Sequence, residues 1–404
     1  MDTPAPQPNP PSDMITRVGA IDLLRAMTMV LMIFVNDLWT LKGIPEWLEH
    51  VGRGVDGMGL ADTVFPAFLF ITGMSLPFAV AARRAKGDTL LQLIGHVVLR
   101  AIALLIMGVF LVNGETINEG ATGLPGAAWD TLSCASFILI WNAWPKSWPA
   151  WASWGLKALG AIILLTLAII YRGDDDGHLV RFAPQWWGIL GLIGWSYLAA
   201  GLVTVLANGR LPVLVSAWVA FALLSMAWAA GLVPDLLHHI PEAIIGGTLA
   251  GLSMGGVVIG RLFQIYQPKN DNRKLTLLLL AIAVALMLCA QFTRPLWGLS
   301  KLDATPAWLF LCSAITIIAF VALYWISDVA GKASWFTLIK PAGTDTLLTY
   351  LIPYFAYAGL GHLYFNLPEV VTTGGIGLVK TFLFALFCVQ VAGLLRRLGL
   401  RLKL

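Results

Sequence analysis

Long runs of apolar residues, separated by short polar stretches, dominate the chain from residue 20 onward. A membrane-spanning helix needs about 17–25 mostly apolar residues, and the runs repeatedly reach this length. The strands of a membrane barrel would be shorter and would alternate apolar and polar side chains. The pattern therefore predicts an all-α, polytopic transmembrane helix bundle of about twelve spans, or eleven if the short run at 131–146 does not cross. The predicted spans are 20–40, 59–81, 92–113, 131–146, 155–171, 186–206, 211–231, 243–264, 275–291, 307–329, 344–362 and 373–395.

The polar segments between these runs are too short to form a separate soluble domain. Residues 1–14 are rich in proline and poor in apolar side chains, which predicts a disordered tail. We therefore expect a single transmembrane domain over residues 15–404.

Composition supports a membrane protein. Hydrophobic residues make up 58% of the chain and charged residues 12%, whereas soluble domains carry about 25% charged residues. The net charge of +4 reflects the loops between spans, so we expect no nucleic-acid partner. The four cysteines lie inside apolar runs without metal-ligand spacing, so we expect no metal site.

The positions of lysine and arginine predict the orientation of the chain. Cytoplasmic loops of membrane proteins are enriched in these residues. With the N-terminus in the cytoplasm, 19 of the 26 fall on the cytoplasmic side and 6 on the other, while Lys380 lies within a span. We therefore expect both termini to be cytoplasmic.

Polar residues gather around the first two predicted spans. Asn36 and Asp37 end the first span, His50 lies in the loop that follows, and Asp62 begins the second span. Polar groups at membrane depth are energetically costly and often functional. Each also has a simpler explanation: Asp62 can cap its helix, and His50 can be an ordinary loop residue. The cluster indicates a candidate site without naming a reaction.

Other charged residues have mainly structural interpretations. Asp22 and Arg25 are three residues apart on one predicted helix and can pair, while anchoring of the topology is the favoured interpretation of Arg25. The long side chain of Lys380 is expected to reach toward the membrane surface. The chain lacks the GxxxxGK, HExxH, GxSxG and CxxC motifs, which argues against a nucleotide-driven pump or a metalloprotease.

The segment at the first predicted span reads RVGAIDLLRAMTMVLMIFVND, and the segment at the second reads GLADTVFPAFLFITGMSLPFAV. Both segments resemble the heparan-α-glucosaminide N-acetyltransferase family and its bacterial relatives, so we expect the protein to reside in a bacterial inner membrane. Weaker similarity follows in PQWWGILGLIGWSYL, which contains Trp187, in LSKLDATPAWLF, which contains Lys301, and in KPAGTDTLLTYLIPY.

The resemblance implies a membrane acyltransferase that moves acetyl from cytosolic acetyl-CoA to an amino-sugar or glycan acceptor on the other side. His50 occupies the interval in which the family keeps its catalytic histidine, as the base or the acetyl carrier. Asp62 and Asn36 match the motif aspartate and the asparagine that ends the first helix. The predicted substrate- and cofactor-binding residues are Asp37, Arg25, Arg100, Trp187 and Lys301.

Two other classes of protein fit the residues. Twelve spans with both ends inside is the common layout of a secondary transporter, although no repeat between the halves is evident. A non-catalytic membrane scaffold is the third interpretation, and a homodimer is possible in each. Neither the acceptor nor the choice between N- and O-acylation follows from the sequence.

Overall fold

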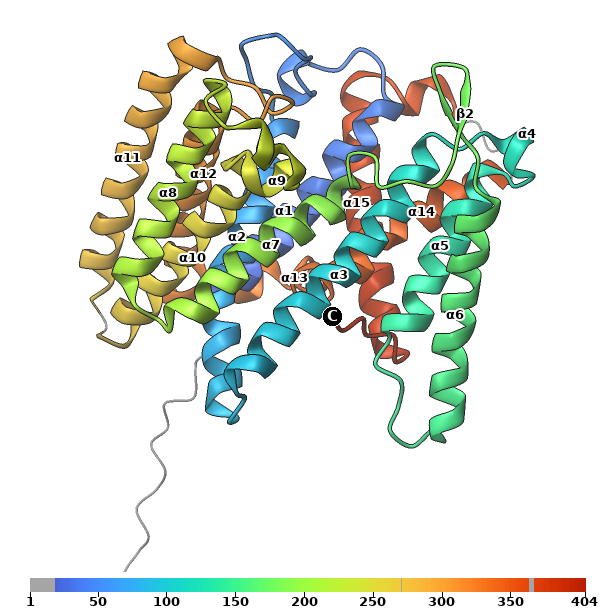
Figure 1. Ribbon diagram of the computed structural model, residues 1–404, viewed down its shortest axis with the longest axis horizontal. Helices are drawn as coiled ribbons and strands as arrows, with labels where there is room; N and C mark the ends of the chain where they lie inside the picture. The colour runs from blue at the N-terminus through green and yellow to red at the C-terminus, as the bar shows by residue number, and fades with distance from the viewer. Residues whose placement is uncertain (1–18, 270, 363–366) are drawn as a thin grey trace, which may run out of the picture.

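The computed structural model describes residues 19–269, 271–362 and 367–404. Within these ranges the chain is built from α-helices, short 3-10 turns, a π-helical turn at Trp325–Val329 and one small hairpin (Figure 1). The helices are α1 (Gly19–Asp37), α2 (Ala61–Ala85), α3 (Leu90–Glu115), α4 (Glu119–Thr122), α5 (Gly126–Trp141), α6 (Ala150–Ile170), α7 (Gly188–Ala207), α8 (Leu211–Ala229), α9 (Glu242–Ile245), α10 (Thr248–Tyr266), α11 (Asn272–Trp297), α12 (Pro306–Tyr324), α13 (Lys340–Thr344), α14 (Thr346–His362) and α15 (Gly374–Arg397). The hairpin pairs β1 (Gly173–Asp175) with β2 (His178–Val180) in antiparallel fashion.

The all-α prediction is confirmed over the described residues, and each predicted span coincides with a helix. Ten of these helices are long and apolar enough to cross a membrane, and α5 and α14 are shorter apolar helices. The predicted span at 131–146 was placed about five residues too late, since α5 starts at Gly126. Pro125 suits the position before a helix, and Pro145 suits the segment beyond its end. The predicted tail at 1–14 lies outside the described residues.

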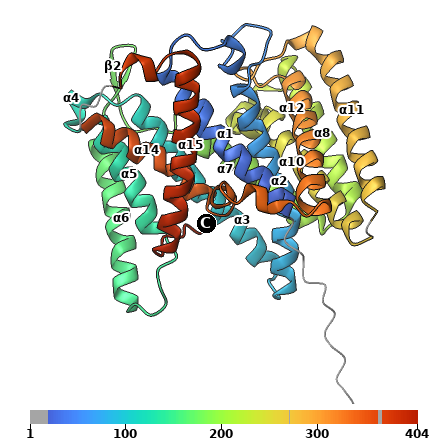
Figure 2. The ribbon, with the colours of Figure 1, turned by 180° about the vertical axis from the view of Figure 1, so that it is seen from behind.

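The long helices run between an upper and a lower face in the view of Figure 1. The loop from α1 to α2, the β1–β2 hairpin and the loop from α11 to α12 lie at the upper face. The α2–α3 turn, the α5–α6 loop and the end of α15 lie at the lower face, as the reverse view in Figure 2 also shows. Two layers of loops therefore enclose the apolar helices.

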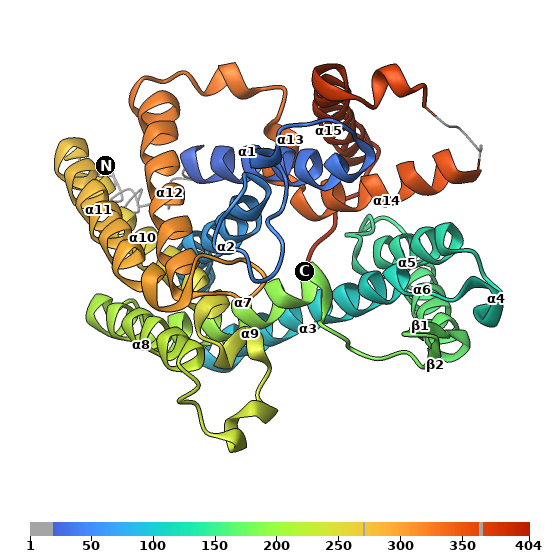
Figure 3. The same cartoon turned by 90° about the horizontal axis from the view of Figure 1, so that it is seen from above.

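Close packing of backbones holds the centre of the bundle together. A β-carbon at Gly73 of α2 would lie 1.8 Å from the carbonyl oxygen of Ser253 in α10, and one at Gly256 would lie 1.9 Å from that of Phe70. Small residues at such positions allow helices to approach closely in a membrane. The view from above in Figure 3 places α1, α2, α3 and α7 centrally, with α5 and α6 on one flank and α8 and α11 on the other. Packing against α10 therefore holds α2 firmly in place.

Candidate functional site

Asp62 and His50 form a hydrogen-bonded pair at the upper end of α2. The side-chain oxygen Oδ1 of Asp62 lies 2.7 Å from Nδ1 of His50. The other oxygen, Oδ2, accepts backbone N–H bonds from Val51 at 3.0 Å and Gly59 at 3.1 Å. The Asp62 side chain is only 2% exposed, whereas that of His50 is 46% exposed. The buried carboxylate therefore fixes one edge of a ring whose other edge faces open space.

The pairing assigns the tautomer of His50. An ionised carboxylate only accepts hydrogen bonds, so Nδ1 of His50 carries the proton and donates it to Asp62. In the neutral ring, Nε2 then keeps a free lone pair, which is the arrangement that a general base requires. The backbone N–H groups that donate to Asp62 belong to the loop before α2, and α2 has no side-chain cap, so the capping explanation for Asp62 was wrong.

Lys301, in the loop between α11 and α12, lies against the same pair. Its Nζ is 3.2 Å from Nδ1 of His50 and 3.9 Å from Oδ1 of Asp62. Burial lowers the pKa of the Lys301 ammonium, and the Asp62 carboxylate acts in the opposite direction. On the following helix, Nε1 of Trp308 donates to the carbonyl oxygen of Asp62 at 3.0 Å. The sequence analysis named His50, Asp62 and Lys301 separately but could not place Lys301 beside His50 across a separation of 251 residues, and it did not indicate Trp308.

Further polar contacts tie the loop after α1 to the loop after α11. Arg294 donates from Nε to both oxygens of Asp56, at 3.0 and 3.1 Å, and the backbone N–H of Leu299 donates to Asp56 at 2.8 Å. The hydrogen bond from Arg294 is the largest cause of a lowered pKa of Asp56. Arg53 and Asp303 form a second link, at 3.5 Å. The loops that carry His50 and Lys301 are therefore held together at several points.

Asp37, at the end of α1, joins three helices. Its carboxylate accepts hydrogen bonds from the hydroxyls of Tyr357 and Thr381 and from Nζ of Lys380, each at 2.7 Å. The same lysine donates to Oγ1 of Thr40 at 2.9 Å. The expectation that Lys380 reaches toward the membrane surface was wrong, because a buried carboxylate lies within its reach. The binding role of Asp37 stays a prediction, and the described contacts of this carboxylate are all with α14 and α15.

Two cavities lie one behind the other between α1, α3, α7 and α14. The larger has a volume of about 420 Å³, and its walls include Arg25, Arg100 and Lys403 near the lower face. The smaller has a volume of about 310 Å³ and includes Asn36 and Glu115 near the upper face. Both cavities are bordered by Met32, Ile189, Leu190 and Tyr350. These shared side chains form the boundary between a cavity with basic side chains in its walls and a cavity lined by tyrosine, amide and carboxylate groups.

The predicted site residues divide between these cavities and the upper loop. Asn36 borders the smaller cavity, while the residues that line the two cavities do not include His50 or Asp62. Trp187, before α7, stands in the left-handed region with φ of 72° and packs edge to face on Trp195 at 5.3 Å. The shared cavity expected for Asn36, His50 and Asp62 therefore stays a prediction, as does a binding role for Trp187.

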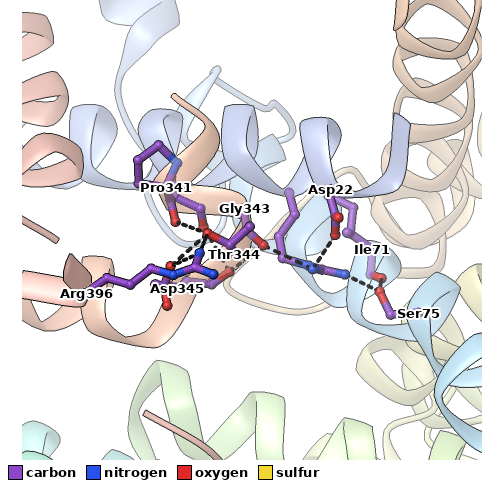
Figure 4. Close-up of polar contacts among 11 residues, drawn as sticks. Asp22, Ile71, Ser75, Pro341, Gly343, Thr344, Asp345 and Arg396 are labelled. Atoms are coloured by element: carbon purple, nitrogen blue, oxygen red, sulfur yellow. Dashed lines mark hydrogen bonds and ion pairs between the residues drawn. The ribbon is translucent and has the colours of Figure 1, made fainter. Parts of the chain in front are cut away.

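The wall of the larger cavity near the lower face is a polar network, shown in Figure 4. Arg25 donates to Asp22 at 3.1 Å, to the carbonyl oxygen of Gly343 at 3.2 Å and to the hydroxyl of Ser75. The pairing of Arg25 with Asp22 that their spacing allows is therefore present. Arg25 joins α1 to α2 and α13 and is held rigidly.

The remaining contacts in Figure 4 belong to α15 and the start of α14. Arg396 donates from Nη1 to Oδ2 of Asp345 at 2.7 Å and to Oγ1 of Thr344 at 2.5 Å. The guanidinium of Arg100, on α3, instead lies 4.9 Å from the ring centre of Tyr197. Arg100 is exposed toward the cavity, so it is the better placed of the two predicted arginines to meet an anion. Over the described residues, no group of three or more His, Cys, Asp or Glu side chains is arranged to hold a metal.

The fold and the site together define an integral membrane protein of apolar helices with a histidine–carboxylate pair at one face. The chain belongs to the family described as "Domain of unknown function (DUF5009)", whose model matches residues 17–224, about half of the chain.

Two curated relatives carry an activity in their names. Heparan-alpha-glucosaminide N-acetyltransferase of Mus musculus is 33% identical over 108 residues, which are 26% of this chain and 16% of the relative. The Homo sapiens protein of the same name is 31% identical over 98 residues, which are 24% of this chain and 14% of the relative. The matches confirm the resemblance seen in the sequence. The aligned part spans only about a sixth of the length of either relative.

Proposed function

We propose that this protein is a membrane-embedded acyltransferase that moves an acetyl group from acetyl-CoA to an amino sugar or glycan. The observation that carries the proposal is the 2.7 Å contact between His50 and the buried carboxylate of Asp62, which leaves Nε2 of the ring available as a base. The similarity to two named N-acetyltransferases supports the choice of reaction class.

The larger cavity is our proposed donor site. Coenzyme A carries several phosphates, and Arg100 and Lys403 supply cations at the walls of this cavity. Arg25 makes these walls more rigid through its hydrogen bonds. The pantetheine arm is long and uncharged, so it suits the apolar wall of Met32, Leu190 and Tyr350 toward the smaller cavity. The thioester would thus approach the outer face while the phosphates stay at the inner one.

The proposed reaction is one direct transfer of the acetyl group from the thioester to the acceptor. The nitrogen or oxygen of the acceptor attacks the thioester carbonyl carbon, forming a new C–N or C–O bond, and the C–S bond breaks. Nε2 of His50 takes the proton that the acceptor loses and passes it to the departing thiolate of coenzyme A, which leaves as the thiol. Asp62 stabilises the imidazolium during the transfer. Asn36 is proposed to donate from its amide to the developing oxyanion.

The proposed orientation places His50 on the extracytoplasmic side. We propose that α5 and α14 cross the membrane together with the ten longer helices, so that both termini face the cytoplasm of a bacterial inner membrane. Reporter fusions after Leu404 and within residues 172–185 test this arrangement. A cytoplasmic signal from 172–185 would reverse the sidedness of the site.

A secondary transporter is the rival function, and the observation that favours it is the pair of cavities that share four bordering residues. The deciding experiment uses the purified protein in detergent and measures binding of acetyl-CoA by calorimetry. Transfer of labelled acetyl to glucosamine is measured in parallel. Saturable binding with transfer supports the acyltransferase, and the absence of both would refute it.

A further inference from the structure

The position of Lys301 beside His50 is not explained by a hydrogen bond between the two. Nδ1 of His50 has one proton and directs it to Asp62, 2.7 Å away, so it has no lone pair to offer Lys301. The ammonium nevertheless lies 3.2 Å from this nitrogen, with its side chain only 18% exposed. The arrangement is therefore an ammonium held against the protonated nitrogen of the ring, with Asp62 as the anion that both groups share.

We propose that Lys301 is a positioning residue whose positive charge keeps His50 neutral until the acceptor gives up its proton. This inference rests on the proposed function, in which neutral His50 is the base. Asp62 stabilises the imidazolium and the Lys301 ammonium opposes it, so the two charges set the protonation of His50 between them. Without Lys301, the carboxylate acts alone and the ring binds its proton more tightly. His50 would then be protonated, and inactive as a base, up to a higher pH.

Among the charged groups around His50, Lys301 is the cation whose charge lies closest to the ring. Asp62 faces the ring from α2, and Lys301 faces it from the loop before α12. The other titratable groups nearby are the buried thiol of Cys312 on α12, the exposed carboxylate of Glu49, and the ion pair of Arg53 with Asp303. The Arg53 side chain is 76% exposed and has its own carboxylate partner, so solvent and Asp303 screen its charge.

The loops that carry His50 and Lys301 hold these two side chains at a fixed distance. The bonds of Asp56 to Arg294 and to the backbone of Leu299 join the loop of His50 to the loop of Lys301. The buried start of α2 fixes Asp62 between them. Lys301 therefore has little freedom to move away when His50 becomes protonated, and the repulsion between the two groups persists.

The test compares Lys301→Met, Lys301→Arg and the control Arg53→Met in the full-length protein. Ring signals of ¹³C-labelled histidine are followed by NMR between pH 5 and 9, with His50 assigned from His50→Gln. Acetyl transfer from acetyl-CoA to glucosamine is measured over the same range. Lys301→Gln replaces Lys301→Met if the latter does not fold.

We expect Lys301→Met to raise the pH at which the His50 ring titrates by about one unit, with the acid limb of kcat/KM moving in parallel. Lys301→Arg keeps the charge and should leave both midpoints within about 0.3 unit, as should Arg53→Met. An unchanged His50 titration in Lys301→Met would overturn the inference, as would loss of transfer in Lys301→Arg with normal titration, since that result makes Lys301 itself the base. If the wild-type protein transfers no acetyl but the His50 titration of Lys301→Met is shifted as expected, the proposed function fails and the charge coupling stands.

Discussion

Replacing Asp62 by asparagine is the sharpest test of the proposed base. The amide keeps the shape of the side chain, and its oxygen can still accept a backbone N–H from Val51 or Gly59. It has no negative charge to stabilise the His50 imidazolium. If its amide nitrogen faces Nδ1, two donors meet, and the ring must switch its proton to Nε2, where the base is needed.

The size of the effect follows from the geometry. With Nδ1 and Oδ1 2.7 Å apart, the charge centres of imidazolium and carboxylate lie roughly 4 Å apart, which corresponds to about 4 kcal/mol at an effective dielectric constant of 20. His50 is 46% exposed, so solvent screening reduces this by about half. A loss of about 2 kcal/mol in the transition state lowers kcat roughly 30-fold. A switched tautomer adds to that loss.

The assay measures transfer of labelled acetyl from acetyl-CoA to glucosamine, with binding of acetyl-CoA measured separately by calorimetry. Asp62→Asn should lower kcat about 30-fold or more while leaving the Kd of acetyl-CoA within a factor of about two, because Asp62 lies outside the proposed donor cavity. Asp303→Asn, the same change in an exposed ion pair at the same face, is the control. A kcat for Asp62→Asn within threefold of wild type would refute the reasoning.

Three further predictions concern other parts of the molecule. His50→Ala should abolish acetyl transfer and leave protein yield and acetyl-CoA binding intact. The control His178→Ala, in the exposed hairpin, should leave transfer, yield and binding unchanged. Transfer at the wild-type rate by His50→Ala would refute the mechanism. Arg100→Gln should raise the Kd of acetyl-CoA about tenfold by calorimetry, since it removes a cation from the cavity wall, and an unchanged Kd would place the donor elsewhere. Gly256→Ala should destabilise the protein by about 3 kcal/mol in thermal unfolding, because its β-carbon would lie 1.9 Å from a backbone oxygen of α2. The control Gly155→Ala, with open space around the new β-carbon, should leave the stability unchanged. Equal melting temperatures of the two variants would contradict the packing argument.

The fold was largely predictable because each membrane helix is coded by its own stretch of sequence. Apolar runs of the right length indicated all twelve long or short apolar helices, although α6 and α10 begin about five residues from their predicted starts and both ends of α5 are shifted by as much. Asp130 lies inside that helix, so a search for uninterrupted apolar residues started the span beyond it. Local composition determines where such helices form, whereas it says little about which helices meet.

The site was predictable only where its parts lie close together in the sequence. His50 and Asp62 are twelve residues apart, and their grouping was visible in the polar stretch between two spans. Lys301 and Lys380 reach their partners through tertiary packing, which no periodicity encodes. Lys380 was misread for this reason, because its buried partner Asp37 sits 343 residues away.

The wall shared by the two cavities bears on electrical insulation. In the proposed orientation the two cavities face opposite sides of the membrane, and water filling both would compress the voltage drop into the side chains around Met32 and Tyr350, which border both. Each elementary charge crossing such a barrier experiences about 2.3 kcal/mol per 100 mV. In the proposed reaction an uncharged acetyl thioester crosses this barrier, while the phosphates stay inside and the acceptor's proton is taken up by His50 at the other face. Acetyl transfer should therefore proceed without drawing on the membrane potential, and enlarging the cavities by truncating Tyr350 should make the host membrane leaky to ions.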